Sequence, residues 1–174
     1  HLEIFKQKDI EVLLLSDRVD EWLVANFGDY EEFPLKSIAK GDLEDLDSKE
    51  DKKKKEKTAK DFEKVITKVQ KILENQVKEV KVSSRLSESP SCLIADENEM
   101  GSNMERIMKS LGQDVPETKP ILEINPKHPL VKKLKTKVDK DLVKVLFDQA
   151  VLSEGGQIKE PAEFVKRMNK LMLS

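Results

Sequence analysis

The stretch from Thr58 to Leu73, TAKDFEKVITKVQKIL, decides the fold. Its first four residues resemble a capping box, in which Thr58 and Asp61 would satisfy the free backbone N–H groups at the start of a helix. Apolar residues then recur at i, i+3, i+4, i+7, i+10 and i+11, the spacing of one helical face. They are Phe62, Val65, Ile66, Val69, Ile72 and Leu73. The sequence therefore predicts an amphipathic helix that begins at Thr58 and buries one side.

Three apolar runs after this helix predict strands, at 77–82, 92–95 and 121–124. The turn residues Ser89-Pro90 indicate that the first two strands pair with each other. Three further helices are expected at 97–111, at 130–152 and from Pro161 to the C-terminus. Asp96 or Ser102 would cap the first of them and Gly112 would close it. The predicted fold class is α+β, a mixed three-stranded sheet with helices and a C-terminal helical pair.

Two other segments precede Thr58. Residues 1–40 contain the apolar run Glu11–Leu15, which predicts a buried strand, and a helix from Arg18, capped by Ser16 or Asp17 and ended by Gly28. A strand followed by a helix is a βα fragment that needs sheet partners from elsewhere, and the start at His1 favours a piece of a longer protein. Residues 41–57 are rich in charge and are interpreted as a linker or an exposed helix start, and 58–174 as one domain.

Charge and composition exclude several classes of function. The 174 residues carry 32 basic and 34 acidic side chains, a net charge of −2, which argues against a nucleic-acid partner. The run Lys52–Lys55 could bind nucleic acid or an anionic membrane, but neighbouring acids offset it and no aromatic residue is interleaved for base stacking. No apolar run approaches the roughly 20 residues that cross a bilayer, so no membrane partner is expected. The single cysteine fits a reducing, cytoplasmic compartment.

The sequence offers little catalytic chemistry. Cys92 lies among Leu93, Ile94 and Ala95, the setting of a small buried side chain rather than a nucleophile. His1 and His128 have no Cys or His partners at metal-binding spacing. Since no glycine-rich phosphate loop is present either, the chain is predicted to have no catalytic residue, no metal site and no cofactor of its own.

A methionine stripe is more informative. Met100, Met104, Ile107, Met108 and Leu111 fall at i, i+4, i+7, i+8 and i+11 in the predicted helix 97–111. Methionine is flexible and polarizable, so such a stripe can repack around different partners. A helix docked on its own sheet would show the same spacing, and periodicity leaves both alternatives open.

The last two helices are apolar over more than one face. We expect a small module to have too little surface to cover them, so they predict a four-helix bundle formed with a second copy of the chain. The expected interface residues are Leu142, Val145, Leu146, Gln149, Ala150, Leu152, Phe164, Met168, Leu171 and Met172.

Several stretches resemble bacterial members of the heat shock protein 90 chaperone family. They are Ile10–Trp22, Val80–Leu86, Ala95–Met100, Leu122–Val131, Leu146–Ala150 and Pro161–Asn169. The resemblance implies that residues 1–40 end a middle domain and that the rest is a C-terminal dimerisation domain whose final helices form the intersubunit bundle. The C-terminal residues Lys170–Ser174 lack the acidic tail of cytosolic eukaryotic relatives, which favours a bacterial, cytoplasmic protein.

The resemblance also implies a function. In the family the methionine-bearing helix contacts unfolded client proteins, and the matching positions here are Trp22, Met100, Met104, Ile107 and Met108. The whole chaperone is an ATPase, with ATP and Mg²⁺ in an N-terminal domain that would precede this chain, so this part is expected not to be an enzyme. The alternative is a purely structural dimerisation module whose methionine helix is ordinary core.

Overall fold

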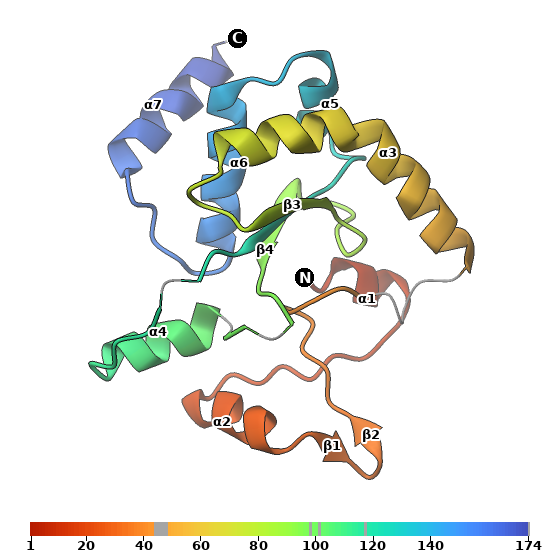
Figure 1. Ribbon diagram of the computed structural model, residues 1–174, viewed down its shortest axis with the longest axis vertical. Coiled ribbons are helices and arrows are strands. Elements are labelled where there is room, and N and C mark those ends of the chain that lie inside the picture. Colours follow the sequence, from red (N-terminus) through yellow and green to blue (C-terminus); the bar gives the residue numbers. More distant parts are fainter. Residues whose placement is uncertain (44–48, 98, 101, 117, 174) are drawn as a thin grey trace.

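The computed structural model describes residues 1–43, 49–97, 99–100, 102–116 and 118–173 (Figure 1). Its helices are α1 (Glu3–Gln7), α2 (Arg18–Asn26), α3 (Lys49–Ile72), α4 (Ser102–Ser110), α5 (Pro129–Thr136), α6 (Lys140–Ser153) and α7 (Pro161–Met172). Its strands are β1 (Asp29–Tyr30), β2 (Phe33–Pro34), β3 (Glu79–Val82), β4 (Ser91–Ile94) and β5 (Ile121–Ile124). The mixture of helices and sheet agrees with the predicted α+β class.

The three-stranded sheet has the order β3-β5-β4. β5 runs parallel to β3, with Val82 opposite Ile124, and antiparallel to β4, with Ser91 opposite Ile124. The expected pairing of 77–82 with 92–95 is therefore wrong, because β5 lies between them. All four residues of β5 are buried, as a strand covered on both faces and both edges requires.

Helix α3 begins nine residues earlier than predicted. Thr58 is not a cap, because its Oγ1 donates a hydrogen bond to the Lys54 carbonyl inside the helix at 2.7 Å. The second half of the charged run thus extends the helix, as the exposed-helix-start interpretation allowed. The apolar face is buried as expected, with Phe62 and Val69 only 3% and 2% exposed.

The core lies between the sheet and the helices. α3 packs against β3, α6 packs against β4, and α7 packs against α6 (Figure 1). The single helix expected over 130–152 is two helices, because the chain leaves helical geometry at Lys137. Asp139 then caps α6 by accepting hydrogen bonds from the backbone N–H groups of Asp141 and Leu142. His128 caps α5 in the same way, through Nδ1 and the Leu130 N–H.

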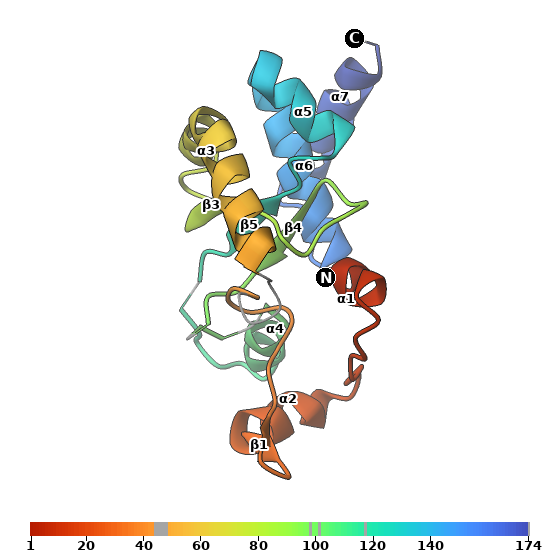
Figure 2. The ribbon, with the colours of Figure 1, turned by 90° about the vertical axis from the view of Figure 1, so that its right-hand side faces the viewer.

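The N-terminal segment departs most from expectation. Residues 11–15 are not a strand, and Leu13 and Leu14 are 76% and 74% exposed. A strand needs a neighbour for its backbone hydrogen bonds, and the part of the chain that the structure describes supplies none here. The helix predicted from Arg18 is present as α2, with Asp17 and Asp20 forming its capping box. Figure 2 shows α2 and β1 at the end of the molecule farthest from α7.

Candidate functional site

Helix α4 carries most of the methionine stripe and is held to the rest of the chain by polar contacts. The Arg106 Nη1 donates to the Gly155 carbonyl at 3.2 Å, and the Thr118 hydroxyl donates to Glu105 Oε2 at 3.1 Å. Met104, Ile107 and Met108 are half-buried, and Leu111, just after the helix, is 63% exposed. Among the side chains of α4 that the structure describes, none is fully buried. The stripe is therefore a surface feature rather than an interior one.

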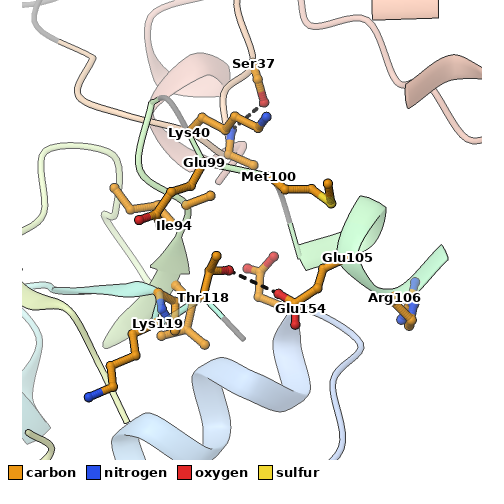
Figure 3. Close-up of a pocket in the computed structure, with 14 residues that line it drawn as sticks. Ser37, Lys40, Ile94, Glu99, Met100, Glu105, Arg106, Thr118, Lys119 and Glu154 are labelled. Carbon is orange, nitrogen blue, oxygen red and sulfur yellow. Dashed lines mark hydrogen bonds between the residues drawn. The ribbon is translucent and has the colours of Figure 1, made fainter. Parts of the chain in front are cut away.

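Met100 is separate from this stripe, because α4 begins at Ser102 rather than at 97 as predicted. It lines a cavity of about 260 Å³ between the segment 37–40, strand β4 and α4. Figure 3 shows Met100 among the residues that line this cavity, together with the hydrogen bond between Thr118 and Glu105. Its lining includes the apolar residues Leu93, Ile94, Ala95 and Pro120, and burial raises the pKa of Glu154, which also lines it.

The predicted client residue Trp22 lies on α2, where it is 48% exposed. Its neighbours Val19 and Leu23 are 64% and 51% exposed, so α2 presents an apolar face to solvent. Both views show α2 and α4 at the same end of the molecule (Figures 1 and 2). The fold therefore brings together, at one end, the two helices that carry Trp22, Met104, Ile107 and Met108.

The predicted dimer residues divide into three groups. Leu142, Val145, Leu146 and Ala150 are at most 6% exposed and belong to the chain's own core. Gln149, Phe164, Met168 and Leu171 are half-buried. Leu152 and Met172 are 48% and 69% exposed. The premise that a small module could not cover α6 is wrong, because α3, β4 and α7 together surround it.

Helix α7 has no buried residue and exposes apolar side chains that the predicted interface omitted. Val165 is 54% exposed and Leu173 is 90% exposed. Val165 and Met172 lie seven residues apart, on the face of α7 directed away from α6. This spacing in the sequence could have indicated that the two side chains share one exposed helix face. Towards α6, Arg167 pairs with Asp148 at 3.6 Å, and burial raises the pKa of this carboxyl group.

A buried ion pair was missed by sequence reasoning. The Arg85 guanidinium is 0% exposed and binds the Glu123 carboxylate of β5 with two hydrogen bonds, at 2.9 and 3.0 Å. Two further N–H groups of Arg85 donate to the carbonyls of Ile38 and Gly41, at 2.5 and 2.6 Å. Ser83 donates to the same carboxylate at 2.7 Å. The one clue was the acidic residue inside the apolar run Ile121–Ile124.

Cys92 is buried and 4% exposed, which confirms its interpretation as a small core side chain. Burial, with a contribution from the nearby Glu123 carboxylate, raises the pKa of its thiol. Within the described ranges, no group of three or more His, Cys, Asp or Glu side chains could hold a metal ion. Nor does any helix of those ranges combine the length and apolar character needed to cross a membrane.

Comparison with known proteins adds a family match. The model of the Hsp90 protein family matches residues 1–174. Chaperone protein HtpG of Ruthia magnifica subsp. Calyptogena magnifica is 81% identical over 172 residues, which cover 99% of this chain and 28% of that protein. Chaperone protein HtpG of Nitrosomonas europaea is 53% identical over 177 residues, again 99% of this chain and 28% of the relative. The chain thus spans about 28% of the length of these relatives.

Proposed function

The chain belongs to the Hsp90 protein family, and we propose that it forms the dimerisation and client-binding part of a bacterial cytoplasmic chaperone. Residues 1–40 would end a middle domain and residues 58–174 would form the dimerisation domain. Its partners would be a second copy of the chain and unfolded or partly folded client proteins. Nucleotide hydrolysis would belong to the remainder of the longer protein, since the relatives are more than three times as long as the aligned segment.

The observation that carries the client proposal is the exposure of α4. An amphipathic helix docked on its own sheet would bury its apolar face. In α4 the side chains of Met104, Ile107 and Met108 are only half-buried, and Leu111 continues the apolar face into solvent. Flexible methionine side chains can adapt to unrelated apolar segments. Trp22 at the same end of the molecule adds an aromatic contact of the kind that concentrates binding energy.

The client site is tested by replacing Met104 and Ile107 with Gln. We expect binding of a chemically unfolded, alkylated protein, measured by fluorescence anisotropy, to weaken about tenfold or more, since burying an apolar side chain contributes roughly 1.5–3 kcal/mol. The control is Lys109→Gln/Ser110→Gln on the polar face of α4, which should bind normally. Unchanged binding by the first variant would contradict the proposal and leave a purely structural module.

Dimerisation is supported by the apolar surface that the last two helices leave exposed. Leu152, Val165, Met172 and Leu173 are each about half exposed or more. Val165 and Met172 share one face of α7, so this exposed apolar face favours an interaction site there, and the same face on two copies would meet in a two-fold contact.

Light scattering over a dilution series tests the dimer. The expected mass is twice 19.9 kDa, falling towards the monomer in Val165→Glu/Met172→Glu because a buried unpaired charge is costly. The control Val19→Glu/Leu23→Glu changes equally exposed residues of α2 and should stay dimeric. A wild-type chain that remains monomeric at every concentration would contradict the dimer and leave the client test unaffected.

A further inference from the structure

The outward face of α3 carries a row of lysines spaced by one helical turn. Successive members are three or four residues apart, so at about 100° per residue they share a narrow arc. At about 1.5 Å per residue the row is roughly 27 Å long. All its members are exposed, and they are Lys53, Lys57, Lys60, Lys64, Lys68 and Lys71.

The row is fixed in its outward direction by the opposite side of the helix. Phe62, Val65 and Val69 are at most 6% exposed and belong to the main core, so α3 cannot turn to bury its lysines. Figures 1 and 2 show α3 along the outside of the molecule, and Figure 1 shows it well apart from α4. The lysine row is therefore a second surface, distinct from the methionine stripe in place and chemistry.

The row has no carboxylate partner in the part of the chain that the structure describes. Among the residues that the structure describes, no carboxylate pairs with any of the six lysines, whereas Lys78 binds both Asp96 and Glu99 at 2.9 Å. The chain has a net charge of −2, so six positive charges on one face leave −8 for the remainder. Like charges three or four residues apart destabilise a helix. Helix propensity accounts for lysines in α3, but it does not explain why six of them share one row.

We propose that the lysine row of α3 is a docking site for an acidic polypeptide segment. An acidic helix with Asp or Glu three and four residues apart repeats its charges every 5.4 Å, the same repeat as the row. Each exposed pair would be weak alone, but six in register add up. The inference goes beyond the proposed client site and does not depend on it.

The flanks of the row favour a narrow polypeptide over a broad anionic surface. Glu56 and Glu63 lie along one side of the row, and Asp61 lies along the other. A membrane or a nucleic-acid duplex is wider than the row and would bring its own negative charges against these carboxylates. Helix α3 contains no arginine, and its one aromatic residue, Phe62, is buried, so the surface around the row lacks the groups that read and stack on nucleic-acid bases.

Fluorescence anisotropy with a labelled, glutamate-rich helical peptide of about 20 residues tests the proposal. The wild-type chain should bind it at about 50 mM salt, and binding should weaken at least about tenfold by 300 mM, as exposed charge pairs are screened. Lys60→Gln/Lys64→Gln/Lys68→Gln should weaken binding about tenfold, since each exposed pair contributes roughly 1.5–5-fold. Restoring the charges as arginines at the same positions should restore binding.

The matched control is Lys127→Gln/Lys137→Gln/Lys140→Gln, which removes the same charge from exposed positions off the row. Equal weakening by this control would mean a general charge effect and would overturn the proposal. Absence of peptide binding at low salt would also overturn the proposal.

Vesicles of phosphatidylglycerol and phosphatidylcholine, and a single-stranded oligonucleotide, are tested in parallel. Binding of either in preference to the peptide would replace the acidic polypeptide as the partner. Circular dichroism checks that the exposed substitutions leave the fold intact.

Discussion

Replacing Arg85 by methionine should strongly destabilise the chain. The guanidinium is fully buried and donates four hydrogen bonds, two to the Glu123 carboxylate and one each to the carbonyls of Ile38 and Gly41. Methionine has a similar length but no donor, so the Glu123 carboxylate, 2% exposed, would retain the Ser83 hydroxyl at 2.7 Å and the Cys92 thiol at 4.0 Å as its donors. Removing one partner of a buried ion pair costs about 3–5 kcal/mol, because an uncompensated charge is left in the interior.

This cost translates into a large thermal shift. For a chain of this length, 1 kcal/mol corresponds to roughly 2–4 °C in melting temperature, so Arg85→Met should lower it by about 6–20 °C. An exposed pair provides the comparison. Lys166 and Glu163 lie 3.6 Å apart with side chains 76% and 48% exposed. Lys166→Met should cost less than about 1 kcal/mol.

A double-mutant cycle measured by urea denaturation separates the ion pair from general damage. Arg85→Met/Glu123→Leu removes both charges together, so it should be more stable than the sum of the single variants predicts, by at least about 2 kcal/mol. Additive losses in the double variant would refute the reasoning. So would a cost for Arg85→Met as small as that of Lys166→Met.

Three further outcomes are expected. Partial burial raises the pKa of Glu3, but hydrogen bonds from Ser87–Ser89 outweigh it and lower the pKa to about 2. Because a lowered pKa stabilises the ionised native state, the stability advantage of wild type over Glu3→Gln should be full above pH 5 and shrink as the pH falls from 4.5 towards 2, measured by urea titrations. Gly41→Ala should cost about 1–2 kcal/mol in the same assay, because φ is +56° and the new Cβ would lie 3.2 Å from that of Glu97. Cys92 should react with maleimide slowly in the native chain and rapidly in urea; fast native labelling would contradict its burial.

The sequence predicted elements whose signals are local. Helix α7 begins at Pro161 and strand β5 covers Ile121–Ile124, both as expected, because a proline at the first helical position and an apolar run between turns act on neighbouring residues. The candidate helices α2 and α4 were found for the same reason. The start of α3 was missed because lysine is a good helix former, so the helix continues past a plausible cap at Thr58.

Properties that depend on distant parts of the chain were not predictable in this way. Strand pairing is one, since nothing near Cys92 shows that β5 will come between β3 and β4. The run Glu11–Leu15 is short and mostly apolar, as a buried strand would be, but such a run supplies no neighbour to pair with. Burial of Leu146 was also missed, because whether a helix is covered by its own chain or by a copy depends on the packing of α3 and α7.

The loop 83–89 explains how these distant parts are joined. Glu3 of α1 accepts hydrogen bonds from its backbone N–H groups at Ser87 and Glu88, both at 2.6 Å. Arg85, in the same loop, holds the carbonyls of Ile38 and Gly41. Residues 4–37 are therefore a segment anchored at both ends to one loop beside the sheet. Backbone hydrogen bonds hold the same two ends: the Ile4 N–H donates to the Arg85 carbonyl at 3.2 Å, and the Gly41 N–H donates to the Ala95 carbonyl at 3.0 Å. Loss of the Glu3 or the Arg85 side-chain contacts therefore leaves each end of the segment attached through backbone hydrogen bonds.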